Sequence, residues 1–146
     1  MSQVLYRSAN VNDVSAIKAL TDQMLSHTGL GVATVPKITA LVNSPKTLFM
    51  LAMIKDKLVG YTCGILHENI FNDVMRVTDI GIFVLPEYRK LEIDRGLLLL
   101  LESWAKENKA HQLWLGQTTG DDVDKIAEYY RKQGFKLCGF NAVKDL

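Results

Sequence analysis

The stretch PEYRKLEIDRGLL, residues 86 to 98, contains the start of a leucine-rich helix and the turn that leads into it. The first N–H groups of a helix lack partners within the helix and lie at the positive end of its dipole, so they favour a bound anion. Glu92 and Asp94 stand in this turn. A carboxylate about 4 Å from an anion costs about 1 kcal/mol in water and about 4 kcal/mol at an effective dielectric near 20. Three basic residues offset the three acidic ones, which leaves the segment neutral overall.

Asp94 allows two interpretations of the turn. An aspartate at the start of a helix can cap it, because its carboxylate accepts the free N–H groups of the first turn. The donors that a phosphate needs would then be occupied. The residues alone therefore fit either a working anion-binding turn or a purely structural helix start.

The length and composition of the chain favour one globular domain that spans residues 1–146. The 146 residues are 48% hydrophobic, and 17 basic against 16 acidic side chains give a net charge of +1. This charge excludes the broad basic field of a non-specific nucleic-acid binder, so no nucleic-acid partner is expected. Cys63 and Cys138 do not make a disulfide framework. The leucine run 97–101 is too short to cross a bilayer and the N-terminus lacks a signal pattern, so we expect a soluble, cytoplasmic protein with no membrane partner.

The pattern of apolar residues predicts a mixed α/β architecture, with a sheet that is partly antiparallel and partly joined by helical crossovers. Asn10, followed by Asp13, is typical of a helix cap. Gly81, inside an apolar run, indicates a bulge or a close backbone approach. The expected elements are a strand at 3–7, helices from about 10 to 29 and from 36 to 45, strands at 47–54, 58–66 and 74–84, a helix at 94–109, a strand at 111–117, a helix at 121–133 and one or two strands within 135–144.

This order of elements resembles the GNAT acetyltransferase family, and two motifs carry the resemblance. VLPEYR, residues 84–89, precedes the leucine-rich helix, and AEYYRKQGF, residues 127–135, resembles the family's tyrosine-containing helix that ends in Gly-Phe. The resemblance covers nearly the whole chain. It implies the GNAT fold, with a central mixed sheet of six to seven strands flanked by about four helices. It also implies an N-acetyltransferase that moves an acetyl group from acetyl-CoA, its co-substrate, to an amine of a small molecule or protein, and it makes a homodimer plausible.

The phosphate turn of the family has an Arg or Gln, two spacers, a Gly, one spacer and a Gly or Ala. Placed without gaps on this sequence, Arg89 matches the first position, whereas Glu92 and Asp94 replace the two small residues. The backbone near Val84 is expected to face the thioester carbonyl, and the edge of its strand to pair with the pantetheine arm. The residues expected to bind the coenzyme are Phe83, Val84, Arg89, Lys90, Leu91, Ile93, Asp94, Arg95 and Gly96.

Tyr130 matches the general acid of the family, which protonates the coenzyme sulfur. Its other interpretation is an aromatic packing residue beside Tyr129 and Phe135. Asp79 is the candidate general base and Glu68 the second candidate, although each also fits a solvated carboxylate or an ion-pair partner, and ordered water is a further possible base. The acceptor side is expected at residues 28 to 44 and at the turn 68 to 73.

The remaining residues bear on two other functions, metal binding and a role without catalysis. His27, His67 and His111 are isolated from each other and from cysteine, so no metal site is expected. Asp121 or Asp122 fits a helix cap. The acidic residues in the turn also favour a second hypothesis, a catalytically inactive GNAT-fold module that serves as an inhibitor, adaptor or structural component.

Overall fold

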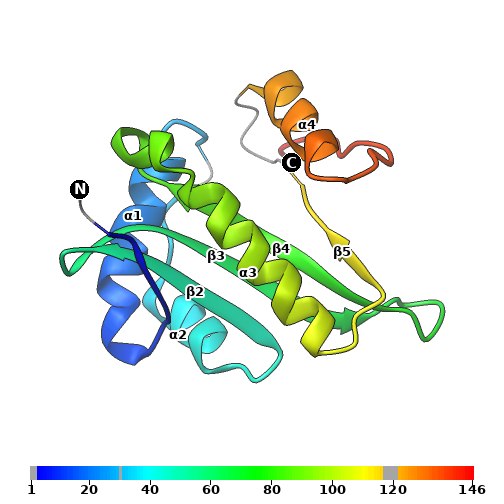
Figure 1. Ribbon diagram of the computed structural model, residues 1–146, viewed down its shortest axis with the longest axis horizontal. Helices are drawn as coiled ribbons and strands as arrows, with labels where there is room; N and C mark the ends of the chain where they lie inside the picture. Colours follow the sequence, from blue (N-terminus) through cyan, green and yellow to red (C-terminus); the bar gives the residue numbers. More distant parts are fainter. Residues whose placement is uncertain (1–2, 30, 117–121) are drawn as a thin grey trace. The chain divides into compact units, whose positions relative to one another are not determined.

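The structure is a computed structural model that describes residues 3–29, 31–116 and 122–146. It divides into two compact units, Met1–Leu115 and Gly116–Leu146, which are described in turn. The first unit holds the whole sheet, with α3 across one face and α1 and α2 across the other (Figure 1). Its elements are β1 (Leu5–Ser8), the 3₁₀ helix η1 (Val11–Asp13), α1 (Val14–Leu25), α2 (Val35–Asn43), β2 (Thr47–Ile54), β3 (Lys57–Glu68), β4 (Met75–Val84), the 3₁₀ helix η2 (Pro86–Leu91), α3 (Ile93–Glu107) and β5 (Gln112–Trp114).

Over the residues that the structure describes, the sheet has five strands in the order β1-β2-β3-β4-β5. The first four strands run antiparallel to their neighbours, and β5 pairs parallel to β4 after the crossover through α3. The predicted count of six to seven strands is too high. The run 135–144, expected to form one or two strands, has no strand. Gly139 lies within it at φ 100°, which interrupts an extended backbone.

The two helices on one face are positioned by short-range signals that the sequence carries. The side chain of Asn10 accepts from the N–H of Asn12 at 2.9 Å, and the Asp13 carboxylate accepts from the N–H of Asn10 at 2.8 Å, which confirms the predicted cap. Ile17 and Leu20 of α1 and Ile38 of α2 are buried in one core cluster against β2 and β3. The apolar stripe of each helix therefore determines the face that it turns to the sheet.

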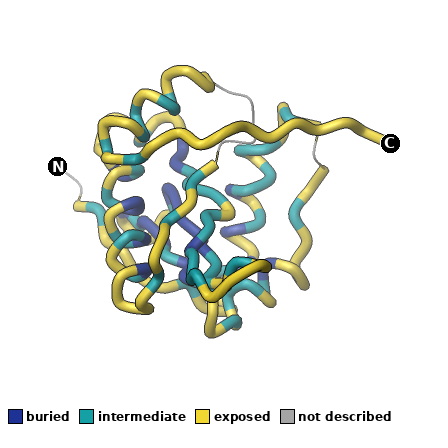
Figure 2. The backbone as a smooth tube through the Cα atoms, turned by 90° about the vertical axis from the view of Figure 1, so that its right-hand side faces the viewer, coloured by how far each residue is buried: buried dark blue, intermediate teal, exposed yellow. Residues whose placement is uncertain are grey.

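The leucine-rich helix α3 fills the opposite face. Ile93, Leu97 and Leu101 have no exposed surface and repeat at four-residue steps, so they form one continuous ridge along the sheet. Figure 2 shows the buried residues concentrated in the sheet and on the inner sides of the helices. The helix begins one residue before its predicted start, at Ile93, and this fixes the geometry of the turn that precedes it.

The second unit contains α4 (Val123–Lys132) and the C-terminal segment. The Tyr130 ring makes tilted contacts with the rings of Tyr129 and Phe135, with centroids 6.1 Å and 5.9 Å apart. Asp122 is the N-cap but makes no side-chain capping hydrogen bond, and Asp121 lies outside the described residues. Residues 137 to 146 are exposed throughout (Figure 2).

Candidate active site

The turn between β4 and α3 is held against the end of β4. The 3₁₀ helix η2 folds back after Leu85, and the Nε of Arg89 donates to the carbonyl oxygen of Val84 at 3.3 Å. Glu92 then adopts φ 55° and ψ 29°, and α3 begins at the next residue. Two of the predicted coenzyme-binding residues, Val84 and Arg89, are therefore in direct contact.

Glu92 adopts the left-handed conformation at the position where the GNAT motif has its glycine. A left-handed residue other than glycine costs about 1–2 kcal/mol relative to the right-handed form. The turn thus keeps the backbone shape that glycine would favour, although the residue type has changed. The Glu92 side chain is exposed and the Asp94 side chain is half-buried.

The N–H groups that open α3 are not capped by a neighbouring carboxylate. The N–H of Gly96 donates to the carbonyl of Glu92 at 3.1 Å, which leaves the N–H groups of Ile93, Asp94 and Arg95 as the unpaired first turn. Glu92 makes no capping bond, and Asp94 does not occupy these donors among the described residues. Uncapped N–H groups at the N-terminus of a helix favour an anion.

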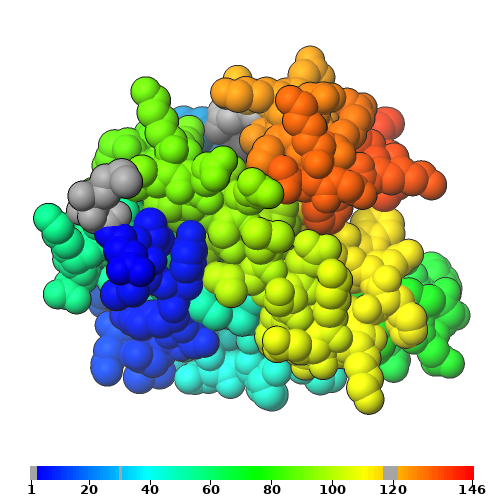
Figure 3. Space-filling view, in the orientation of Figure 1, coloured from blue at the N-terminus to red at the C-terminus, as the bar shows by residue number. Residues whose placement is uncertain are grey.

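The side chains around this helix start divide into two groups. Ile93 is fully buried against Ala52, Val59 and Val84, so it anchors the turn to the sheet. Gly96 lies directly against Tyr6 of β1, and Figure 3 shows β1 (blue) beside the α3 surface (yellow-green). The exposed group comprises Arg89, Lys90, Leu91 and Arg95.

The second half of β4 has a strand partner on only one side. Among the described residues, β5 pairs with Arg76, Val77 and Thr78 and with no later residue of β4. The N–H of Leu85 donates to Val59 of β3 at 2.9 Å, so alternation turns the N–H of Val84 away from β3. The Arg89 bond to the Val84 carbonyl agrees with this direction. Val84 therefore presents a backbone N–H where the sequence predicts contact with a thioester carbonyl.

A bulge separates the two halves of β4. Cys63 pairs with Gly81 and Gly64 pairs with Asp79, which leaves Ile80 as the extra residue. The bulge predicted from Gly81 is confirmed. It also reverses the alternation, so that residues on its two sides no longer follow a single period of two.

Asp79 lies on the α3 face of β4. Val77, two residues before it, packs against Leu101, and Gly64 opposite Asp79 faces the same leucine. Asp79 is half-buried and adjacent to the bulge. Glu68 lies at the end of β3, where it lines a broad, shallow cavity of about 860 Å³ at the far end of α2. The two candidate bases therefore lie at different places on the sheet.

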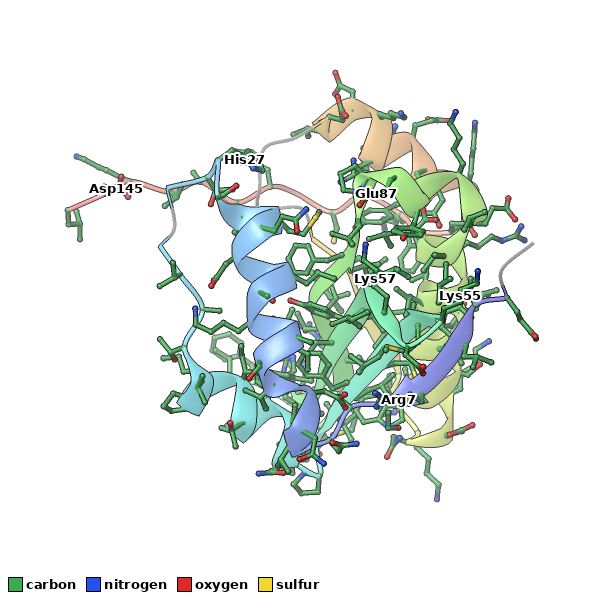
Figure 4. The ribbon with its side chains drawn as sticks, turned by 90° about the vertical axis from the view of Figure 1, so that its left-hand side faces the viewer. Arg7, His27, Lys55, Lys57, Glu87 and Asp145 are labelled. Carbon is green, nitrogen blue, oxygen red and sulfur yellow. The ribbon has the colours of Figure 1, made fainter. Side chains whose placement is uncertain are left out.

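A cavity of about 340 Å³ lies on the opposite face of β4, between the sheet and the two N-terminal helices. Figure 4 shows this side, with His27 marking the end of α1 and the linker that descends to α2. Its lining includes Thr21, Leu25, Ala33, Lys37, Ile38, Phe49, Tyr61, Cys63, Ile80 and Phe83. Residues 28 to 44 were expected on the acceptor side, and part of that segment does line this cavity.

Three polar side chains that line this cavity, those of Thr21, Tyr61 and Cys63, were not predicted as functional. The hydroxyls of Thr21 and Tyr61 share a hydrogen bond of 2.6 Å. Burial raises the pKa of the Tyr61 hydroxyl well above its usual range, and the hydrogen bond between Tyr61 and Thr21 opposes this only in part. Burial also raises the pKa of the Cys63 thiol to about 12, with a smaller contribution from Asp79. In the sequence, these groups are visible only as polar residues within otherwise apolar segments.

Phe83 belongs to this cavity through its side chain, which lies 5.3 Å from the Tyr61 ring between centroids. Tyr130 belongs to the second unit, where its hydroxyl donates to the carbonyl of Gly116 at 3.3 Å. The structure thus brings the residues of the turn together with Val84 and places Asp79 before the bulge on the α3 face of β4, while Tyr130 is described within the second unit alone.

Comparison with known protein families shows to which family the chain belongs. Residues 19–135 match the Acetyltransferase (GNAT) family. The chain belongs to this family. No curated protein matches the sequence.

Solved structures share the GNAT fold at low sequence identity. An aminoglycoside 6′-N-acetyltransferase from Acinetobacter baumannii has a TM-score of 0.80 at 19% identity, over 99% of this chain and 98% of that one. AAC(6′)-Iy, in complex with the bisubstrate analogue CoA-S-monomethyl-acetylneamine, has a TM-score of 0.80 at 14% identity over 99% of each chain. A ribosomal-protein-alanine N-acetyltransferase from Brucella melitensis biovar Abortus 2308 has a TM-score of 0.75 at 15% identity over 98% of each chain. These identities establish the fold of this GNAT protein and leave its substrate open.

Two further observations concern the described part of this GNAT chain. No helix there is long and apolar enough to span a bilayer. No three side chains of His, Cys, Asp or Glu in residues 3–29, 31–116 and 122–146 come together in a way that could hold a metal ion.

Proposed function

We propose that this GNAT protein transfers an acetyl group from acetyl-CoA to an amine of a small molecule or protein. One observation carries the proposal. The N–H groups that open α3 are uncapped, and they follow a residue held in the left-handed conformation that the phosphate turn requires. Asp122 opens α4 with the same two features, and the start of α3 differs from it in following β4 directly and in the exposed Arg89, Lys90 and Arg95 around it.

The residues of the turn suit the charged end of the coenzyme. The N–H groups of Ile93, Asp94 and Arg95 would face the diphosphate, with Gly96 keeping the next turn of the helix narrow. Arg89, Lys90 and Arg95 supply positive charge around it, while Leu91 offers exposed apolar surface. The half-buried Asp94 opposes binding, and the exposed cations offset its charge.

The reaction needs a neutral amine, a polarised carbonyl and a proton for the departing thiolate. Acetyl-CoA supplies the acetyl group as a thioester. The N–H of Val84 would polarise the thioester carbonyl, and the unpaired stretch of β4, including the backbone of Phe83 and Val84, would pass along the pantetheine arm. Tyr130 would act as general acid, on the match of its motif alone. Asp79 remains the candidate base, with water as the alternative proton acceptor.

Calorimetric titration with acetyl-CoA tests the proposal most directly. We expect saturable binding that weakens when Arg95 is changed to Glu, because this reverses a charge at the helix start. Lys144→Glu is a matched control, since it makes the same charge change in the exposed C-terminal segment. Absence of binding at millimolar acetyl-CoA would remove the transferase proposal.

A second candidate is an inactive GNAT-fold module that binds another protein. Glu92 and Asp94 favour it, since both place carboxylates where the family has small residues. The double change of Glu92 and Asp94 to Gly discriminates the two. If affinity for the coenzyme arises only in the double variant, the natural protein is the inactive module.

We also propose that residues 1–146 form a single domain, that the protein is cytoplasmic and that it can form a homodimer.

A further inference from the structure

The cavity between the N-terminal helices and β4 has the size of a small-molecule site. Its volume is about 340 Å³, and ligand pockets in proteins span roughly 300–1,000 Å³. It is lined from α1, the α1–α2 linker, α2, β2, β3 and β4, and Ile80 at the bulge forms part of its wall. A molecule in this cavity would therefore contact the strand whose other features serve the proposed transfer.

The lining is apolar and aromatic at its base. Phe49, Tyr61 and Phe83 form a chain of ring contacts, with centroids 5.0 Å and 5.3 Å apart. Aromatic rings bind another ring by edge-to-face or offset contacts and by the removal of apolar surface from water. The base of the cavity thus suits a ring or a branched apolar group.

No lining residue carries negative charge at neutral pH. Lys37 is the charged residue of the lining, and among the described residues it makes no ion pair. Tyr61 and Cys63 stay protonated because burial raises the pKa of each. Two carboxylates lie near the lining without belonging to it: Asp22 forms an ion pair with Lys18 and accepts from the N–H of Ala33, and Asp79 adds to the raised pKa of the Cys63 thiol.

This charge pattern distinguishes between classes of amine. A polycation such as an aminoglycoside loses hydration on entry and needs carboxylates to replace it. In this cavity, a polycation would meet the ammonium group of Lys37 instead of a carboxylate. A carboxylate on the acceptor would be attracted to Lys37, which is exposed and lies at the cavity rim.

We infer that the cavity takes a small amine with an aromatic or branched apolar body and a carboxylate, of the kind found in an aromatic amino acid. This inference rests on the proposed function, since it names the acceptor of the same reaction. The ring lies among Phe49, Tyr61 and Phe83, and the carboxylate faces Lys37. Polycationic amines, the substrates named for several structural relatives, are excluded from this cavity.

Ligand-observed NMR titration tests the inference through binding, without reliance on turnover. The probes are L-phenylalanine, phenethylamine, which lacks the carboxylate, and kanamycin A as a polycation. We expect L-phenylalanine to bind at least tenfold more tightly than kanamycin A. Because an exposed ion pair contributes about 0.2–1 kcal/mol, loss of the carboxylate should weaken binding about threefold. Lys37→Glu should remove this preference for the acid.

Ile80→Trp locates the site. Ile80 is 47% exposed, so the larger ring can be accommodated in the fold while it enters the cavity. We expect at least a tenfold weaker affinity for L-phenylalanine and unchanged affinity for acetyl-CoA. Val11→Trp, at a residue 55% exposed outside the cavity lining, is the matched control and should bind both like the natural protein.

The outcomes separate the two proposals. Kanamycin A binding as tightly as L-phenylalanine, or Ile80→Trp binding L-phenylalanine like the natural protein, overturns the inference. Binding of acetyl-CoA without L-phenylalanine also overturns it and leaves the transferase proposal standing. Binding of L-phenylalanine without acetyl-CoA supports the cavity assignment and removes the transferase proposal.

Discussion

Tyr6 and Gly96 are in such close contact that a side chain at residue 96 would have to displace the hydroxyl end of the Tyr6 ring. A β-carbon built there would lie 2.9 Å from Cζ of Tyr6 and would overlap its hydroxyl. The edge strand β1 is thereby fitted to the first turns of α3, next to the proposed coenzyme site. Glycine in this helix is explained by packing, even though it costs about 1 kcal/mol in helix propensity.

Gly96→Ala should change the free energy of unfolding by less than about 0.5 kcal/mol, because displacement of the hydroxyl end of the 37% exposed Tyr6 ring offsets much of the better helix propensity of alanine. In a Tyr6→Leu background the same change should stabilise by about 0.5–1 kcal/mol, as propensity then acts alone. Urea unfolding of the four proteins measures both values. Equal effects in the two backgrounds would contradict the contact.

Changes at Glu92 separate backbone conformation from charge. Glu92→Gly should raise the free energy of unfolding by up to about 1 kcal/mol, because it relieves a left-handed residue at φ 55°. Glu92→Gln removes the charge but keeps the conformation, and should leave stability within about 0.5 kcal/mol. Both should tighten acetyl-CoA about fivefold, given about 1 kcal/mol for an exposed charge about 4 Å away. Calorimetry that shows a gain for Gly and none for Gln would assign the effect to conformation alone.

The Arg7–Asp13 pair gives a pH dependence with a definite sign. Hydrogen bonds from Arg7 lower the pKa of the Asp13 carboxyl, with a further bond from the Asn10 N–H, while burial opposes them. A lowered folded-state pKa means that this stabilisation is complete above the unfolded pKa of about 3.9 and is lost as pH falls through the folded value. Asp13→Ala should cost about 1–2 kcal/mol at pH 7, mainly through the lost cap.

The difference between Asp13→Ala and the natural protein should shrink as pH falls below about 4, because the carboxyl then becomes protonated first in the unfolded and then in the folded state. Asp13→Asn is the control, because it keeps a capping oxygen while losing the ion pair with the 44% exposed Arg7 side chain. That loss is about 0.2–1 kcal/mol. A pH-independent gap for Asp13→Ala would show that the ionised form contributes nothing.

How much of this was visible in the sequence depends on the range of the interaction. The Asn10–Asp13 cap, the two N-terminal helices and the bulge at Gly81 follow from neighbouring residues, and each was predicted. The run 135–144 was predicted wrongly as strand, because its apolar residues fit an extended pattern whereas Gly139 interrupts it at φ 100°. A strand also requires a partner, and a sequence pattern does not identify one.

The residues of the candidate site also divide into those that the local sequence could place and those that it could not. Arg89 and the start of α3 could be placed because they are adjacent in sequence. The face of β4 that Asp79 occupies could not, because the bulge at Ile80 changes the alternation. The Thr21–Tyr61 pair joins residues 40 positions apart, so no local pattern revealed it.

Tyr130→Phe tests the proposed general acid. Removing the hydroxyl should lower kcat about a hundredfold or more, the range for loss of a positioned acid, while acetyl-CoA affinity changes little. The ring and its packing against Phe135 remain. Tyr129→Phe is the matched control on the same helix and should retain activity. A Tyr130→Phe variant with unchanged kcat would leave Tyr130 as a packing residue.

The two cysteines should differ in reactivity. Cys63 is 1% exposed and burial raises its pKa to about 12, whereas Cys138 is exposed. A thiol reagent at pH 8 should therefore modify one thiol in the folded protein and two in urea, because the thiolate is the reactive form. Peptide mass analysis should place the first modification at Cys138. Rapid labelling of Cys63 would indicate that the cavity opens readily to solvent.

The positive φ of Glu92 has a consequence for how such loops evolve. A ligand held only by main-chain atoms responds to torsion angles and is indifferent to which amino acid supplies them. The amino acid at that position can then change as long as the surrounding fold keeps the backbone torsion angle. The backbone angle at residue 92 is therefore a better guide to the shape of this turn than the amino acid that occupies it.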